Sequence, residues 1–400
     1  MDWSFLIQDK DALVVTTDSR KVTPGSVFVA LKGEHFDGND FVEQAKQDGA
    51  AYVICGENAL ADLQDLARAW RRSLDIPVLG ITGTNGKTTT KELCAAVLGT
   101  KYNVLYTQGN LNNQLGVPLT LLSITRAHEV AIIEMGASHP GDIKELVEIA
   151  EPTCGLITNV GRAHLQGFGS FEGVQRTKAE LYEWLVSHNG TVFQNTDNPY
   201  LVEMLGRIGG LGSLRQLVEY HTGTMPEGTH LVGAYNAENV SAAICVGEYF
   251  GISREDALAA IRAYVPTNNR SQLLQTARNT VVIDAYNANP TSMTAAIEAF
   301  GREGQEAKER KRACYILGAM RELGEYSHLE HQNIVNMLLE RRAEQVLLVG
   351  EEYKETTAPY PVFADVDALS AYLTEHPVSD ARILLKGSRS NQLEKIIPLL

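Results

Sequence analysis

The sequence predicts an α/β protein of three domains: a small α/β N-terminal domain, a central domain with a mostly parallel sheet, and a C-terminal α/β domain. Its 400 residues, 44% of them hydrophobic, supply several cores at the usual size of about 150 residues per domain. From Ile76 onward, short β-branched runs alternate with segments of helical periodicity, which is typical of parallel sheets covered by helices. Pro266 and the polar residues 267–269 break this alternation, which then restarts.

The first predicted domain covers residues 1–75. Short apolar runs predict strands over residues 27–31 and 51–55, and a helix is expected over residues 40–47. Between them, residues 33–39 are rich in turn formers.

The central domain is predicted over residues 76–266. Its expected strands cover residues 78–82, 130–134, 156–159 and 191–194. A helix is expected to start near Glu172, whereas residues 198–233 show little strand pattern.

The last predicted domain covers residues 267–400. Its expected strands cover residues 281–284, 314–317, 345–349 and 383–386. Each is followed by a helical stretch, such as residues 293–300. This order of elements again predicts a parallel sheet.

The charge balance limits the classes of ligand. Lys and Arg number 35 and Asp and Glu 49, which gives a formal net charge of −14. Such a chain is not expected to bind nucleic acid or an anionic membrane surface without specificity. Any anionic ligand must therefore be held by a local arrangement of donors and cations.

The predicted location is the cytoplasm. The N-terminal residues lack the basic start and apolar core of a secretory signal, and no apolar run reaches the ~18 residues needed to span a bilayer. No stable membrane insertion is expected. The five cysteines stand singly, which is typical of free thiols in a reducing compartment.

The strongest chemical signal is a glycine loop between a predicted strand and a helix. The loop consists of Gly83, Thr84, Asn85, Gly86, Lys87, Thr88 and Thr89. Backbone N–H groups and the positive end of a helix dipole would converge there on a phosphate. Lys87 can reach the β and γ oxygens, and the Thr88 hydroxyl can coordinate Mg²⁺. The general P-loop pattern has glycine where this chain has Ile81, but a chance turn is disfavoured because strand, loop and helix come in the required order.

Two side chains at the ends of neighbouring strands are candidates for metal binding. Glu134 ends an apolar strand, so its carboxylate would lie at the sheet edge where ligands bind and could hold a hard cation. His164 follows the next strand and would open onto the same edge. A structural histidine remains the alternative for His164. Lys178 lies on a predicted helix, and spacing alone favours a solvated surface lysine.

Three residues near the start of the last domain could contact a nucleotide. Asp284 follows a buried strand and could accept a ribose hydroxyl, and Tyr286 could cover an adenine face. An ordinary polar turn before a helix at Pro290 is the alternative, and taken alone the better one. Arg270 could reach a γ-phosphate or serve as a surface ion-pair partner.

Taken in order, these segments resemble the Mur ligase family of ATP-dependent amide-bond ligases over nearly the whole chain. The segments that carry the resemblance are residues 17–20, 28–33, 82–91, 109–113, 134–137, 163–165, 167–170, 235–236 with 239, 284–290, 322–324 and 386–389. Within the family, they are most similar to the members that join D-Ala-D-Ala to UDP-MurNAc-tripeptide in peptidoglycan synthesis.

The resemblance implies a reaction and a role for each domain. The first domain would hold the uridine nucleotide of the substrate, the central domain would be a P-loop ATPase, and a Rossmann-like third domain would bring D-Ala-D-Ala. A substrate carboxylate would attack the ATP γ-phosphate, giving an acyl phosphate and ADP. The dipeptide amine would then displace phosphate. Such chemistry requires positioning and charge neutralisation. A monomer is expected.

The resemblance also implies roles for individual residues. Lys87 and Thr88 would contact the phosphates and a first Mg²⁺ shared with Glu134, and His164 would approach a second Mg²⁺. Lys178 matches a lysine that much of the family carries as a carbamate, which overrides the surface-lysine interpretation. The remaining assignments are Asn239 near adenine, Asp284 on ribose, Arg270 on phosphate, Ser19, Arg20 and Lys32 at the uridine nucleotide, and Lys386, Ser388 and Arg389 where the third domain meets the peptide and dipeptide.

Two features depart from the family pattern. The stretch of residues 198–233 looks shorter than its counterpart in the family. Gly318-Ala319-Met320 replaces the usual Gly-Asp-Met. The ligase that adds diaminopimelate is disfavoured because its Asp-Asn-Pro-Arg motif is missing from the third domain. A folylpolyglutamate synthase type of ligase and a P-loop kinase of a small molecule remain alternatives, and so does a nucleotide-responsive protein without catalysis.

Overall fold

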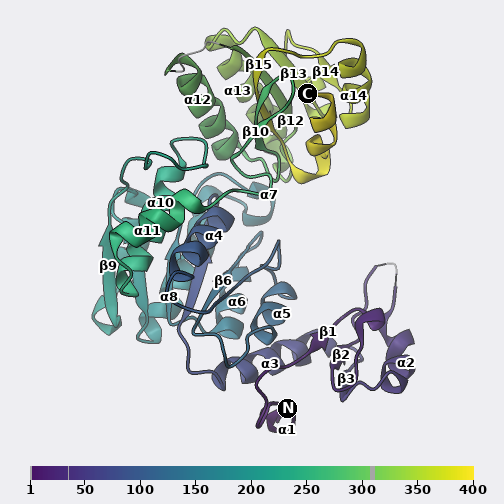
Figure 1. Ribbon diagram of the computed structural model, residues 1–400, viewed down its shortest axis with the longest axis vertical. Helices are drawn as coiled ribbons and strands as arrows, with labels where there is room; N and C mark the ends of the chain where they lie inside the picture. The colour runs from purple at the N-terminus through teal and green to yellow at the C-terminus, as the bar shows by residue number, and fades with distance from the viewer. Residues whose placement is uncertain (1, 35, 307–310) are drawn as a thin grey trace.

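Three sheets, one after another along the chain, organise the molecule, and the predicted α/β fold is confirmed. The computed structural model describes residues 2–34, 36–306 and 311–400. Figure 1 shows the three sheets and their helices stacked along the long axis, with the N-terminal end at the bottom and the C-terminal end at the top. The central part lies between the other two and touches both.

The N-terminal sheet is small and parallel, with the order β1-β2-β3. Its strands are β1 (Val15–Thr16), β2 (Val27–Val29) and β3 (Tyr52–Ile54), and its helices are α1 (Ser4–Ile7) and α2 (Val42–Gln47). The helix expected from residue 40 begins as a 3₁₀ turn, Gly38–Phe41, which the Asp37 carboxylate caps by accepting from Asn39 N. Both predicted strands are present but shorter than expected.

The central sheet has six parallel strands in the order β5-β6-β4-β7-β8-β9. The strands are β4 (Val78–Thr82), β5 (Val104–Tyr106), β6 (Val130–Glu134), β7 (Cys154–Ile157), β8 (Thr191–Asn195) and β9 (Gln216–Tyr220). The helices are α4 (Lys87–Leu98), α5 (Gly116–Leu122), α6 (Asp142–Ala150), α7 (Leu165–Phe168), α8 (Phe171–Ser187), α9 (Pro199–Ile208), α10 (Asn236–Tyr249) and α11 (Arg254–Ala263). The glycine loop follows β4, so it leaves the sheet between two neighbouring strands.

The expectation of little strand in residues 198–233 is wrong at one place, because β9 forms the edge of the central sheet there. Its first residues are exposed and its last, Tyr220, is buried. An edge strand buries few side chains, so its sequence lacks the apolar run by which the other strands were found.

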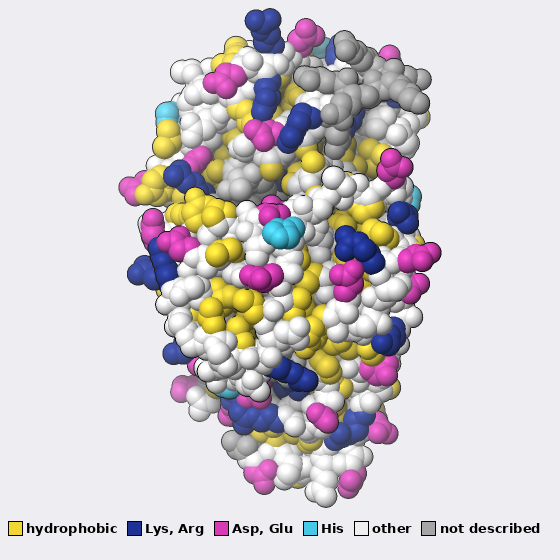
Figure 2. Space-filling model, turned by 90° about the vertical axis from the view of Figure 1, so that its left-hand side faces the viewer, with side chains coloured by type: hydrophobic (Ala, Val, Ile, Leu, Met, Phe, Trp, Pro, Cys, Tyr) yellow, Lys and Arg dark blue, Asp and Glu magenta, His cyan; other side chains and the backbone are white. Residues whose placement is uncertain are grey.

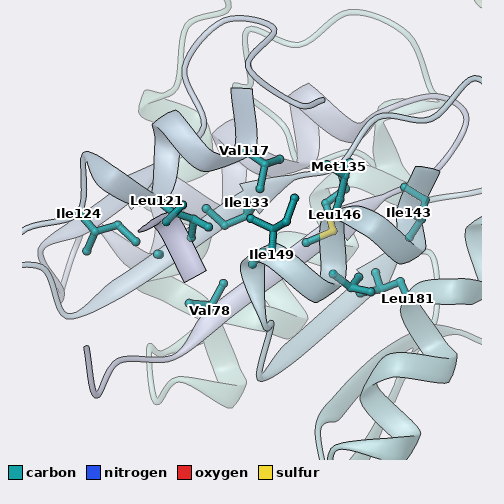
Figure 3. Packing of buried hydrophobic residues seen from close by; sticks show 14 of the residues in the cluster. Val78, Val117, Leu121, Ile124, Ile133, Met135, Ile143, Leu146, Ile149 and Leu181 are labelled. Atoms are coloured by element: carbon teal, nitrogen blue, oxygen red, sulfur yellow. The ribbon is translucent and has the colours of Figure 1, made fainter. Parts of the chain in front are cut away.

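One face of the central sheet carries a large apolar core. Side chains of β4 and β6 meet those of α5, α6 and α8, as Figure 3 shows for Val78, Ile133, Leu121 and Leu146. These four side chains are fully buried. This packing fixes the strand ends from which the functional loops leave.

Helix α3 (Ala59–Arg72) joins the N-terminal sheet to this core. It packs against α5 and α6, and Trp70 Nε1 donates a hydrogen bond to the Ile124 carbonyl at 2.9 Å. Arg71 Nε donates to the carbonyl of Ala150 at 3.2 Å. The domain boundaries at residues 75 and 266 stay predictions, and α3 lies on the central core although it precedes the first of them.

The C-terminal sheet has the order β10-β11-β15-β12-β13-β14. Its strands are β10 (Gln272–Gln275), β11 (Thr280–Asp284), β12 (Arg312–Gly318), β13 (Gln345–Val349), β14 (Val362–Phe363) and β15 (Ala381–Lys386), and its helices are α12 (Pro290–Glu306), α13 (Ser327–Glu340) and α14 (Val366–Glu375). The edge strand β10 pairs antiparallel and the other described pairs are parallel. The strands at 281–284, 314–317, 345–349 and 383–386 are confirmed, the third with the predicted bounds and the others with slightly wider ones.

The surface matches the mixed composition. Figure 2 shows acidic and basic side chains interspersed over the face drawn there, with apolar side chains between them. All five cysteines are free thiols, and four of them are buried. Within the described ranges, no helix combines the length and the apolar character that crossing a membrane requires.

Candidate active site

A cavity of about 1010 Å³ is lined by both the central and the C-terminal parts of the chain. It lies at the carboxyl ends of β4, β6 and β11, where ligands bind in sheets of this kind. The predicted residues that line it are Thr84, Asn85, Gly86, Lys87, Thr88, Thr89, Glu134, His164, Asn239, Arg270, Asp284, Tyr286 and Lys386. Residues as far apart in the sequence as Thr84 and Lys386 thus share one cavity.

The glycine loop is held in shape by the segment that follows β7. Gly83 has φ +144°, and a Cβ there would lie 2.0 Å from Thr158 Oγ1. That hydroxyl donates to the Asn85 carbonyl at 2.6 Å. Asn159 Oδ1 accepts from Asn85 N at 3.0 Å, and the Asn159 carbonyl accepts from Thr84 N at 2.9 Å. The close approach explains why glycine stands at position 83.

Lys87 lies at the first turn of α4, folded over the loop. Its Nζ donates to the carbonyl oxygens of Gly83 at 2.8 Å and Thr84 at 3.0 Å. Burial lowers the pKa of Lys87 to about 8, with Arg270 acting in the same direction and Glu134 opposing it. The Lys87 side chain therefore lies inside the anion-binding loop, and its pKa lies close to neutral pH.

Glu134 ends β6 with its carboxylate buried. Its Oε1 accepts from Asn112 Nδ2 at 2.8 Å, and its backbone N donates to Thr107 Oγ1 at 3.0 Å. Its Oε2 accepts no hydrogen bond from any described residue, and Lys91 Nζ lies 4.0 Å away. A buried carboxylate oxygen without a donor is costly unless a cation neutralises it.

This arrangement fits a hard divalent cation. The Glu134 oxygen and the Thr88 hydroxyl face the same cavity, and oxygen ligands are what Mg²⁺ prefers. In the part of the chain that the structure describes, no three His, Cys, Asp or Glu side chains cluster as a metal site. Mg²⁺ bound in proteins commonly completes its coordination with water and substrate phosphate oxygens.

His164 and Lys178 both lie near the ring of Phe168. The His164 and Phe168 ring centroids are 6.2 Å apart, and Lys178 Nζ lies 5.7 Å from the Phe168 centroid. Lys178 is 2% exposed, so the surface-lysine alternative is wrong. Burial, and then the charge of Lys87, hold the pKa of Lys178 well below its usual range.

The pKa of His164 is also lowered. Burial is the main cause, the positive charges of Lys87 and Lys178 add to it, and Glu322 opposes it. Nδ1 of the ring lies against the Glu322 carboxylate, a pair that is ionic only when the ring is protonated, and Nδ1 forms no hydrogen bond with any described residue. His164 therefore lies at the wall of the cavity in contact with Glu322.

The residues expected to contact a nucleotide base and ribose form some of their contacts with other residues of the chain. Asn239 accepts from Thr90 Oγ1 at 3.0 Å and donates to Asn236 Oδ1 at 2.9 Å, and a Cβ on Gly86 would lie 2.3 Å from its Oδ1. Asn239 thus supports the back of the glycine loop. The Arg270 guanidinium carbon lies 4.0 Å from the Tyr286 ring centroid.

Lys386 lies next to the residue expected at the ribose. Its Nζ is 2.5 Å from Asp284 Oδ2 and donates to the Asn287 carbonyl at 3.3 Å. Both side chains line the cavity. The structure therefore groups Lys386 with Asp284, whereas the resemblance placed it with the dipeptide.

Five predicted substrate residues do not line this cavity: Ser19, Arg20, Lys32, Ser388 and Arg389. Arg20 is paired with Asp18 at 2.8 Å, and Arg389 with Glu394 at 2.9 Å. Lys32 Nζ lies 3.9 Å from Asp37, and Ser388 Oγ accepts from Arg321 N at 3.2 Å. Their roles stay predictions. Gly83 and Lys178 likewise are not among the residues that line the cavity.

Several side chains at the site were not assigned a role from sequence. They are Thr107, Asn112, Thr158, Asn159, Asn289 and Glu322. Asn289 Nδ2 donates to Asn85 Oδ1 at 2.8 Å, which joins the start of α12 to the glycine loop. The one sequence feature that these residues share is their position, because each lies in a loop that follows a strand.

These features define a P-loop nucleotide-binding protein with its site between two α/β domains. Family models match three parts of the chain: residues 13–96 (Mur ligase family, catalytic domain), 81–213 (Mur ligase middle domain) and 269–389 (Mur ligase, glutamate ligase domain). The chain belongs to the Mur ligase family.

Individual relatives are similar over nearly their whole length. UDP-N-acetylmuramoyl-tripeptide--D-alanyl-D-alanine ligase of Bacillus subtilis is 34% identical, with 96% of this chain and 92% of that protein covered. The MurF ligase of Thermotoga maritima, solved in complex with ADP, has a TM-score of 0.84 at 26% identity, with 98% of each chain covered. MurF of Acinetobacter baumannii has a TM-score of 0.83 at 28% identity, covering 96% of this chain and 92% of that one.

We expect Gly83→Ala to weaken ADP binding at least about tenfold, because the added Cβ would push the loop away from Thr158. The matched control is Gly56→Ala. Gly56 also has a positive φ, +88°, but nothing lies within 4 Å of a Cβ there. Isothermal titration with ADP measures both variants. Equal affinities would contradict the steric argument.

We also expect ADP affinity to fall about tenfold from about pH 7 to about pH 9, because Lys87, with a pKa of about 8, loses its charge over this range. The phosphates keep their charge there, so the sign follows from Lys87. Lys87→Arg stays protonated throughout and should bind ADP with little change. If ADP affinity fell equally with pH in the wild type and in Lys87→Arg, the pH dependence would belong to another group.

Proposed function

We propose that this chain is an ATP-dependent amide-bond ligase that adds D-Ala-D-Ala to UDP-MurNAc-tripeptide in the cytoplasmic stage of peptidoglycan synthesis. One observation carries the proposal: the nearly full-length similarity to ligases named for this reaction, at 34% identity. The glycine loop, the buried Glu134 and the cavity shared by two domains support it.

The residues of the cavity suit phosphoryl transfer from ATP. Backbone N–H groups of the loop and Lys87 would hold the phosphates, and Arg270 would neutralise charge that develops on the γ-phosphate. The substrate carboxylate attacks the γ-phosphorus, so a C–O–P bond forms and ADP leaves. The dipeptide nitrogen then forms a C–N bond to the acyl carbon and phosphate leaves. The protein supplies position and charge more than covalent chemistry.

Two Mg²⁺ ions are proposed to assist the phosphoryl transfer. Glu134 and Thr88 would hold the first, and His164 would approach the second, each ion neutralising phosphate charge when bound. The unpartnered Glu134 oxygen is the structural reason for the first assignment.

Lys178 is proposed to carry a carbamate. A buried lysine whose pKa is lowered keeps part of its amine neutral, and a neutral amine attacks CO₂ to give an anionic carbamate and a proton. The product replaces the amine by an anionic group with two oxygens, which could serve as metal ligands.

The three parts of the chain would each serve one substrate. Residues 1–75 would bind the uridine nucleotide through Ser19, Arg20 and Lys32, residues 76–266 would bind ATP, and residues 267–400 would bring the dipeptide near Ser388 and Arg389. Asp284 and Tyr286 would contact ribose and adenine from the third domain, with Asn239 behind the loop. A monomer is then sufficient, because one chain supplies every predicted site residue. The five free thiols fit a reducing cytoplasm.

The main test is ADP formation over a panel of substrates. Sustained ADP formation should require both UDP-MurNAc-tripeptide and D-Ala-D-Ala, because the acyl phosphate needs the first and its turnover needs the second. Lys87→Ala, which removes the cation of the loop, is the inactive control. ADP formation with folate and glutamate would favour the folylpolyglutamate synthase type. ADP formation with a single acceptor that becomes phosphorylated would favour a small-molecule kinase, and ATP hydrolysis with neither substrate would contradict the proposal.

The carbamate has its own test, which does not depend on turnover. Protein equilibrated with ¹³C-bicarbonate should show a carbamate resonance that disappears in Lys178→Arg and persists in Lys144→Arg, since Lys144 is exposed. Activity of Lys178→Ala should fall at least about tenfold. A resonance that survives Lys178→Arg would assign the carbamate to another lysine.

A further inference from the structure

The start of α12, in the C-terminal part, lies directly on the glycine loop of the central part. Asn289, the residue before α12, donates from Nδ2 to Asn85 Oδ1 at 2.8 Å, and Asn85 Nδ2 lies 3.5 Å from Asn289 Oδ1. Asn85 stands in the middle of the loop and lines the cavity. Asn289 is 6% exposed and is not among the lining residues. The contact therefore joins a residue of the phosphate loop to a buried side chain outside the cavity.

The other hydrogen bonds of Asn289 determine which way its amide points. Its Oδ1 accepts from Ser292 N at 2.9 Å, and its backbone N donates to Ser292 Oγ at 3.1 Å, so Asn289 caps the first turn of α12. A backbone N–H can only donate, so the amide oxygen of Asn289 must face Ser292 and its nitrogen must face the loop. Asn85 Oδ1 is then the acceptor of that nitrogen.

A second set of contacts holds the same elements together. Thr291 Oγ1 accepts from Arg162 N at 3.2 Å, and a Cβ on Gly161 would lie 2.9 Å from that oxygen. Gly161 N in turn donates to Thr84 Oγ1 of the glycine loop at 2.9 Å. The start of α12 thus packs on the loop and on the segment that follows β7, which is the segment that shapes the loop.

The central part holds the backbone of Asn85, and the C-terminal part holds its side chain. Asn85 N donates to Asn159 Oδ1 at 3.0 Å, and the Asn85 carbonyl accepts from Thr158 Oγ1 at 2.6 Å. Asn289 adds the contact with the side chain. A loop residue held at all these points leaves little freedom to the neighbouring N–H groups, and those are the groups that a phosphate would bind. A loop ordered in advance binds its ligand at a lower entropic cost.

We propose that Asn289 is a positioning residue for the glycine loop. It holds Asn85 from the C-terminal part and so keeps the loop in the shape that receives the nucleotide phosphates. Nucleotide affinity then depends on a side chain of the C-terminal part that touches no nucleotide. This inference rests on the nucleotide site of the proposed function, but not on the identity of the acceptor or of the incoming amine.

The variant Asn289→Ser separates the two roles of this side chain. Serine caps a helix about as well as asparagine, but it has no amide, and its side chain ends one bond before the position of Nδ2. The variant also adds no charge near the phosphates. Arg162→Ala is the control, because Arg162 forms an ion pair with Glu330 at 3.4 Å across the same boundary and does not line the cavity.

Isothermal titration with ADP measures the wild type and the variants. Asn289→Ser should weaken ADP binding about three- to tenfold, the size expected for the loss of one hydrogen bond that orders a loop, and Arg162→Ala should change it less than about twofold. Asn85→Ala removes the same contact from the other side and leaves the helix cap intact. The double variant should bind ADP little more weakly than either single variant, because each of these proteins lacks the same contact.

The double-mutant cycle decides the proposal. Losses that add up in the double variant would show that the two side chains act independently, and the proposal would be wrong. Unchanged ADP affinity in Asn289→Ser or in Asn85→Ala, or an equal loss in Arg162→Ala, would also overturn it. Melting temperatures without ADP check that each variant is folded. A coupled cycle in a protein that forms no ligase product would contradict the proposed function and leave the role of Asn289 standing.

Discussion

The close approach of the glycine loop to the end of β7 is the constraint on which the site depends. β4 and β7 are parallel neighbours, so the loops that follow them leave the same edge of the sheet. Thr158 and Asn159 hydrogen-bond the loop from that side, and only a residue without Cβ fits at position 83. The loop therefore takes its shape from the sheet before any phosphate arrives, which reduces the cost of ordering it on binding.

The same edge of the central sheet carries the donors and cations with which an acidic chain can bind an anion. The net charge of −14 opposes a triphosphate at long range. Close to the loop, however, Lys87, Arg270 and Lys386 line one cavity, together with the N–H groups at the start of α4. Several carboxylates also line the cavity, and one of them, Glu134, has an oxygen that accepts no hydrogen bond from a described residue and is left for a cation. Binding is thus governed by a few short contacts and not by the overall field.

Local sequence signals predicted four of the six strands in each of the two larger sheets and the glycine loop, because buried strands are continuous apolar runs and the loop is a contiguous motif. Strands β5, β9, β10 and β14 were missed, since none of them is a run of buried side chains. The pairing of Asp284 with Lys386 could not be foreseen because it follows from strand order: β11 and β15 are neighbours, and these two residues are in register. The contact of His164 with Glu322 depends on how two domains dock, which no local pattern encodes. The family resemblance, and not spacing, pointed to Lys178.

Helix α3 makes the N-terminal part less separable than its small sheet suggests. Leu63, Leu66 and Trp70 are fully buried, and they share one core with α5 and α6 of the central part. A fragment that began at residue 76 would leave that core open to water and expose a broad apolar surface. The N-terminal and central parts are therefore not modular in their hydrophobic core, so exchange of N-terminal domains between related proteins would have to carry α3 and its partner surface together.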